Sequence, residues 1–213
     1  LGGKSGVVNV AENFGYSLDK KDPEIKEKIE KLFRELVEFE KKGYRIGAIP
    51  AEHYLLIEKY FGNLKEFFHI EKWKVETEKE GEEEESEFFV RMKISGDFVE
   101  ERMRIDGGPV DAAYKTFSKL LVGKYPEIQN LKLEDFHVGI ARSKAEESTV
   151  RTLITFRDDE IFQTVGVDTN IIQSAIESLA KGFNYYLNKL NTENRKFSVS
   201  QTQGTQGVRN GRK

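Results

Sequence analysis

Hydrophobic residues in the first third of the chain recur every three or four positions, which is the spacing of one face of a helix. This spacing predicts three short helices, and the second of them has clear start and stop signals. Asp22 can cap its first turn, Pro23 fits the first helical position, and Gly43 can end it. We therefore predict a helical subdomain over residues 1–66.

From about residue 67 the spacing changes to the alternation of hydrophobic and polar side chains that is typical of strands. Three strands and one helix are predicted, and the same order then repeats. The two predicted helices follow Asp106 and Asp168, and aligning these residues matches the apolar positions of both helices. We therefore predict an α+β fold in which the helical subdomain precedes two βββα units, 67–125 and 131–190.

Three segments interrupt these patterns. Glu76–Glu87 is an acidic run, which we interpret as a solvated hairpin loop. Ser143–Ser148 is predicted to be a polar loop between two strands. Residues 191–213 are rich in Gln, Thr, Gly, Asn and Arg and have few apolar side chains, so we predict a disordered tail.

Composition narrows the classes of function. The chain has 213 residues, no cysteine and a net charge of −3, which argues against nucleic acid as a partner. No run approaches the roughly 18 apolar residues of a membrane span, so no membrane contact is expected. The lack of cysteine fits a reducing compartment, and we expect a cytoplasmic location. The chain begins at Leu1 rather than at Met, and we expect it to be a piece of a longer protein.

The sequence contains no recognisable motif of catalytic or metal-binding residues. His53, His69 and His137 are scattered without the spacing of metal ligands. No motif places a nucleophile beside a base. We therefore predict no catalytic residue, no metal ligand and no cofactor in this chain, and a free-standing enzyme is the interpretation with the least support.

Two junctions between a predicted strand and a predicted helix could bind a small anion. Asp106–Gly108 places two glycines at a helix start, and Asp168–Asn170 forms the equivalent corner in the second unit. Free N–H groups and the helix dipole at such ends bind carboxylates. A free α-amino acid fits this chemistry, with its ammonium group on Asp106 and its side chain in an apolar pocket. Helix capping with a tight turn is the alternative.

Several stretches, in order along the chain, resemble the region that follows the catalytic barrel in the isopropylmalate and citramalate synthases. The segment Ile105–Lys115 resembles the family's GNGPVDA, and Thr164–Ile172 resembles VGVSxNIIEAS. Further similarities are GKSN at Gly3–Val7, LExxGYxFExAExSxxLL at Leu36–Leu56, and LxDY at Leu133–Phe136. The linker similarity favours the citramalate type. The chain departs from the family at Asp106-Gly107, where Gly-Asn is usual, and at Phe136, where Tyr is usual.

The resemblance implies a regulatory role. In this family a barrel condenses acetyl-CoA with a 2-keto acid using a divalent metal, and that barrel is missing here. By this resemblance, the helical subdomain would correspond to a linker, and the two βββα units would correspond to a regulatory domain that forms a homodimer. This domain would bind the end-product amino acid, isoleucine or leucine, for feedback inhibition. A dimerisation module without any effector is the alternative.

The resemblance also implies an effector site. Carried onto the matching positions, it comprises Asp106, Gly107, Gly108, Val110, Leu133, Phe136, Val167 and Thr169. We add Ile140, because strand alternation places it on the same face as Phe136.

Overall fold

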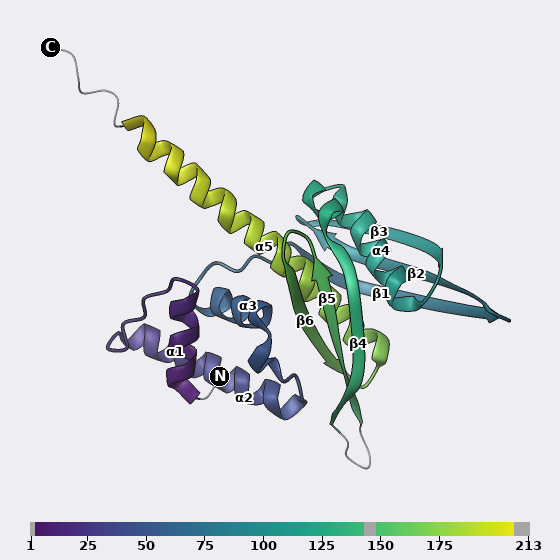
Figure 1. Ribbon diagram of the computed structural model, residues 1–213, viewed down its shortest axis with the longest axis horizontal. Helices are drawn as coiled ribbons and strands as arrows, with labels where there is room; N and C mark the ends of the chain where they lie inside the picture. Colours follow the sequence, from purple (N-terminus) through teal and green to yellow (C-terminus); the bar gives the residue numbers. More distant parts are fainter. Residues whose placement is uncertain (1–2, 143–147, 207–213) are drawn as a thin grey trace.

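The computed structural model describes residues 3–142 and 148–206, and it places a helical subdomain beside two small sheets (Figure 1). Three helices come first, and two successions of three strands and a helix follow, which is the predicted α+β order. The helical subdomain contains α1 (Gly3–Asn13), α2 (Pro23–Lys42), the short 3-10 helix η1 (Ile46–Ala48) and α3 (Pro50–Tyr60).

Each βββα unit forms one three-stranded antiparallel sheet with its strands in sequence order. The first unit consists of β1 (Phe68–Glu80), β2 (Glu83–Ile94), β3 (Asp97–Asp106) and α4 (Pro109–Val122). The 3-10 helix η2 (Pro126–Asn130) leads to the second unit, which consists of β4 (Lys132–Arg142), β5 (Thr149–Arg157), β6 (Ile161–Asp168) and α5 (Ile171–Gln206). The predicted repeat is therefore confirmed.

Local chemistry sets the ends of α2 as predicted. The Asp22 carboxylate accepts a hydrogen bond from the N–H of Glu24 at 2.8 Å, and Pro23 occupies the first turn. Gly43, with φ of +93°, closes the helix, because its left-handed conformation suits glycine. The inward faces of the three helices share an apolar core, which also contains Val165 of β6. The helical subdomain therefore packs directly on the second sheet.

A single larger core joins the two units. Along β2 the buried side chains alternate with outward ones, so that Phe88 and Val90 lie inside. Helix α4 lies over β2 and β3, and α5 lies over β5 and β6. The rings of Phe117 on α4 and Phe183 on α5 are 6.1 Å apart within the same core. Each unit therefore completes the burial of the other.

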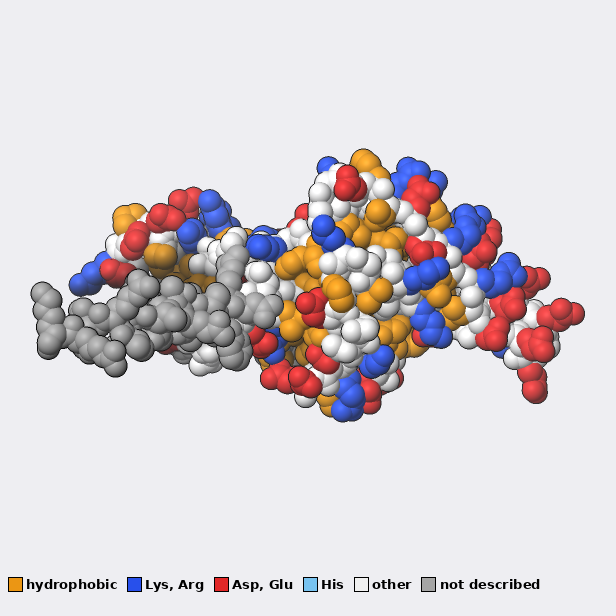
Figure 2. All heavy atoms as spheres, turned by 90° about the horizontal axis from the view of Figure 1, so that it is seen from above, with side chains coloured by type: hydrophobic (Ala, Val, Ile, Leu, Met, Phe, Trp, Pro, Cys, Tyr) orange, Lys and Arg blue, Asp and Glu red, His pale blue; other side chains and the backbone are white. Residues whose placement is uncertain are grey.

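The acidic run does not form the predicted loop. Strand β1 continues to Glu80 and β2 starts at Glu83, so only two residues make the turn. Ser86 is fully buried, and carboxylates on the outer face pair with arginines across the ladder, as Glu87 does with Arg102. Such pairs stabilise a charged strand, which composition alone does not reveal. The tip remains strongly acidic (Figure 2, right end).

The end of the chain also differs from the prediction. Helix α5 continues to Gln206, whereas a disordered tail was predicted from residue 191. A helix that tertiary packing has nucleated can propagate through polar residues at little cost when no proline interrupts it. Residues 207–213, and the predicted loop 143–148 except for Ser148, lie outside the described residues. Among the helices that are described, none is long and apolar enough to cross a membrane.

Candidate effector site

The first predicted corner is open at the start of α4. Gly107 has φ of +135°, which favours glycine, and its N–H donates to the carbonyl oxygen of Glu84 at 2.8 Å. Gly108 is the N-cap residue, and without a side chain it offers no acceptor to the first N–H groups of the helix. A Cβ at Gly108 would meet only the Glu84 carboxylate, at 3.7 Å. The start of α4 therefore has no N-cap side chain that accepts from its first N–H groups.

The second corner is capped by its own side chains. The Asp168 carboxylate accepts from the N–H of Asn170 at 2.8 Å. The side-chain oxygen of Asn170 accepts from the N–H groups of Ile172 and Gln173 at 2.8 and 3.1 Å. Thr169 is exposed beside this cap. The two corners are equivalent in sequence but differ in chemistry, because the donors of the second are already bonded.

Strand β4 presents apolar side chains to solvent. Phe136 lies opposite Ile154 and Ile140 opposite Val150 in the β4–β5 ladder, so the expected alternation holds. This is the face on which Ile154 is buried beneath the helices. Phe136 is nevertheless 44% exposed and Ile140 70% exposed, because α5 packs mainly over the other two strands.

The other predicted site residues lie in different surroundings in the structure. Val110 is buried in the shared core, and Leu133 packs against that core. Val167 lies on the opposite face of the second sheet, where it packs against the helical subdomain. Its backbone N–H donates to the Glu177 carboxylate at 3.0 Å. Within the described ranges, the two cavities discussed below are lined by other residues.

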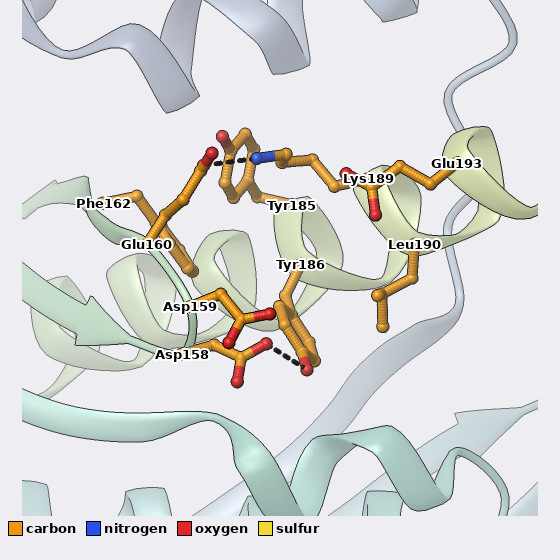
Figure 3. A pocket seen from close by; sticks show the side chains of 9 residues that line it. All are labelled: Asp158, Asp159, Glu160, Phe162, Tyr185, Tyr186, Lys189, Leu190 and Glu193. Atoms are coloured by element: carbon orange, nitrogen blue, oxygen red, sulfur yellow. Dashed lines mark hydrogen bonds and ion pairs between the residues drawn. The ribbon is translucent and has the colours of Figure 1, made fainter.

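A cavity of about 210 Å³ lies between the β5–β6 turn and α5 (Figure 3). The Tyr186 hydroxyl donates to Asp158 at 2.8 Å, and the Lys189 ammonium donates to Glu160 at 2.6 Å. Burial, together with the bond to Asp158, raises the pKa of Tyr186 above its ordinary value. Four of the polar side chains that line the cavity are thus paired with one another. The lining residues are Asp158, Asp159, Glu160, Phe162, Tyr185, Tyr186, Lys189, Leu190 and Glu193.

In the part that the structure describes, no group of three or more His, Cys, Asp or Glu side chains is arranged to hold an ion.

The structure contains a cluster of charged side chains that the sequence did not predict. Glu52 of α3 is 2% exposed, and its carboxylate lies 3.3 Å from the Lys181 ammonium of α5. Lys181 also contacts Glu177 at 3.1 Å. In the sequence Glu52 has the pattern of an ordinary first-turn acid. The sequence feature that could have predicted this cluster is on α5. Polar residues recur there every three or four positions of a largely apolar helix, at Glu177, Lys181, Asn184 and Asn188.

Comparison with known proteins assigns this fold to a class. The model of the LeuA allosteric (dimerisation) domain matches residues 48–187, and the chain belongs to this family. The chain is thus a regulatory and dimerisation region, as the resemblance implies.

Three relatives of the chain are (R)-citramalate synthases. The chain is 34% identical over 194 residues to the (R)-citramalate synthase of Aquifex aeolicus, 32% over 190 residues to that of Sulfolobus acidocaldarius, and 31% over 193 residues to that of Geobacter sulfurreducens. These alignments cover 88–89% of this chain but only 34–36% of the relatives. The chain therefore spans about a third of the length of the curated relatives it matches.

Proposed function

We propose that the chain regulates an acyltransferase of the citramalate synthase kind by binding an end-product branched-chain amino acid, isoleucine or leucine. The parent enzyme would condense acetyl-CoA with a 2-keto acid in a barrel outside this chain, where its divalent metal would also be held. The catalytic residues would lie in that barrel. Bound effector would slow the barrel, and the coupling between such sites is typically about 1–3 kcal/mol.

The open corner at the start of α4 is the observation that carries this proposal. The N–H groups behind Gly108 suit the carboxylate of an amino acid, and the exposed Asp106 suits its ammonium group. The apolar face of β4, with Phe136 and Ile140, suits a branched aliphatic side chain. In this proposal, the first corner takes the two charged groups of the ligand and the face of β4 takes its side chain.

Dimerisation without an effector is the second candidate. The self-capped corner at Asp168–Asn170 favours it, because there the helix start is satisfied without any ligand. If the first corner were equally inert, the exposed face of β4 would serve only to contact another chain.

Calorimetric titration of the chain with isoleucine and leucine tests the proposal. Gly108→Val should block the carboxylate, and Phe136→Ala should remove an apolar wall, so each should weaken binding about tenfold or more. A Cβ at position 108 makes no close contact, so α4 should remain folded. Phe98→Ala is the matched control, because Phe98 is an exposed aromatic side chain on β3 and outside the candidate site.

Two outcomes would count against the proposal in different ways. If the wild-type chain binds neither amino acid at millimolar concentration, the effector function is wrong and dimerisation alone takes its place. If the wild type and both variants bind equally well, the effector function stands but the site lies elsewhere.

A further inference from the structure

The contact between the helical subdomain and the second sheet has a charged centre. The Glu52 carboxylate accepts the N–H of Val165 on β6 at 2.8 Å and lies 3.3 Å from the Lys181 ammonium. Lys181 donates to the carbonyl oxygen of Val165 at 2.8 Å. Its ammonium group also lies 4.6 Å from the centre of the Tyr44 ring. One strand of the sheet is thus held by α3 and α5 together.

Tyr44 and Glu177 extend this cluster. Tyr44 follows the end of α2, and its hydroxyl donates to the Glu177 carboxylate at 2.7 Å. The other carboxylate oxygen of Glu177 accepts the N–H of Val167 at 3.0 Å. The backbone carbonyl of Tyr44 accepts from the Arg151 side chain on β5 at 2.7 Å. Tyr44 therefore joins the linker to two strands and to α5.

The charges in the cluster fix its geometry. Two carboxylates, Glu52 and Glu177, face a single ammonium group, that of Lys181. The other oxygen of each carboxylate accepts a backbone N–H, that of Val165 for Glu52 and that of Val167 for Glu177. The Tyr44 hydroxyl donates to the same Glu177 oxygen that Lys181 contacts. A buried carboxylate that loses a donor is costly, so the partners have to move together or exchange as a set.

Gly43 brings the linker against β4. A Cβ on Gly43 would lie 2.9 Å from the Cβ of Ala141 and 3.0 Å from its carbonyl oxygen. Only glycine allows the end of α2 to approach the strand this closely. Ala141 is the direct neighbour of Ile140, which belongs to the candidate effector site.

We infer that the Gly43-Tyr44 turn, acting through Glu177, is the contact that reports effector binding to the linker. The inference rests on the proposed function for its ligand. Two residues of the predicted effector site are connected to this turn through one intermediate residue each. Ile140 is covalently next to Ala141, and Val167 shares the Glu177 carboxylate with Tyr44. A ligand that shifts the end of β4 or β6 therefore changes what the turn can contact.

The linker has room to respond to such a shift. A cavity of about 400 Å³ borders the charged cluster, and Phe39, Glu52 and Lys181 are among the residues that line it. Tyr44 is thus a positioning residue, whose loss should uncouple the linker from the ligand without removing the ligand site.

Amide hydrogen exchange of the full chain, with and without saturating isoleucine or leucine, tests the inference. In the wild type, the ligand should change exchange in the linker helices α2 and α3. Tyr44→Phe should bind the ligand with an affinity within about threefold of wild type, but its linker helices should no longer respond. Without ligand, the variant should exchange about fivefold faster around residues 43–46, the factor expected for the loss of one hydrogen bond.

Tyr16→Phe is the matched control. The Tyr16 hydroxyl also donates to a carboxylate at 2.7 Å, that of Glu58, but this bond lies wholly within the helical subdomain. Tyr16→Phe should keep the linker response of the wild type. Glu177→Gln is the second variant, and it should reproduce the loss of response if Tyr44→Phe does not fold.

The outcomes separate the two proposals. If the wild type binds no amino acid, the proposed function fails, and the reporting role fails with it. If the wild type binds but its linker exchange does not change, or if Tyr44→Phe responds as the wild type does, then the proposed function survives and the inferred contact is wrong.

Discussion

At Gly166 the backbone of β6 lies directly against α5. A Cβ at this position would overlap the carbonyl group of Ser174 and lie 2.9 Å from the backbone nitrogen of Ser178. The hydroxyls around it are buried and bonded, as Thr164 is to the carbonyl oxygen of Ser178 at 2.7 Å. The close approach of strand and helix therefore depends on the absence of a single methyl group.

Gly166→Ala should lower the free energy of unfolding by roughly 1–3 kcal/mol, because the helix has to move away from the strand. Gly139→Ala on β4 is the matched control, since a Cβ there would meet nothing within 4 Å. The control should stay within about 0.5 kcal/mol of wild type. Urea denaturation of both variants measures the difference, and equal midpoints would contradict the close packing.

Among the elements, α5 combines an apolar face with a polar stripe. Glu177 and Lys181 belong to the charged cluster described above. Farther along the stripe, the Asn188 side chain accepts from the N–H of Lys65 at 3.0 Å and donates to its carbonyl oxygen at 2.9 Å. Asn184 accepts from the N–H of Phe67 at 3.1 Å. The backbone of the segment that connects the helical subdomain to β1 is thereby hydrogen-bonded to side-chain amides of α5.

Replacing Asn188 with alanine should cost about 1–3 kcal/mol, because it removes the two hydrogen bonds that the buried Asn188 side chain makes to the backbone of Lys65. The amide of Lys65 should also exchange faster with solvent, which NMR can follow residue by residue. Asn191→Ala, one turn farther along the same helix, is the control and should have little effect on that amide. Unchanged exchange at Lys65 in the Asn188 variant would show that the connector is held by other contacts.

For the whole molecule, the exposed face of β4 is the surface most suited to a second chain. A dimerisation domain needs an apolar surface that its own fold leaves open, and β4 offers Phe136 and Ile140. The outer face of the first sheet instead carries paired charges, such as Arg91 with Glu100. Charged faces of this kind are seldom at the centre of a homodimer interface.

The chain should be a dimer at micromolar concentration, as light scattering or sedimentation can establish. Ile140→Glu should weaken the dimer about tenfold or more, because it places a charge in an apolar interface. Ile161→Glu, at an exposed isoleucine at the start of β6, should leave the dimer unchanged. A wild-type monomer would contradict the dimer itself, and equal effects of both variants would place the interface elsewhere.

The sequence by itself determined the order of the elements, the repeat of the two units and the glycine corner before α4. Short stretches of sequence encode these features. The spacing of hydrophobic residues distinguishes helix from strand, and capping residues such as Asp22 and Gly43 mark where a helix begins and ends. The same local signals misjudged the acidic run and the last part of α5. There, cross-strand ion pairs and continuation of a packed helix outweigh composition.

Only the tertiary structure decided the partners of the buried charges and the difference between the two corners. Glu52 binds an N–H group 113 residues away, and no periodicity reports such a pairing. Asp168 and Asn170 turn back onto their own helix, whereas Gly108 has no side chain that can do so. The physical reason is the same in both cases. The cost of burying a polar group depends on the donors and acceptors that the fold brings within about 3 Å, and these are set by the packing of distant segments.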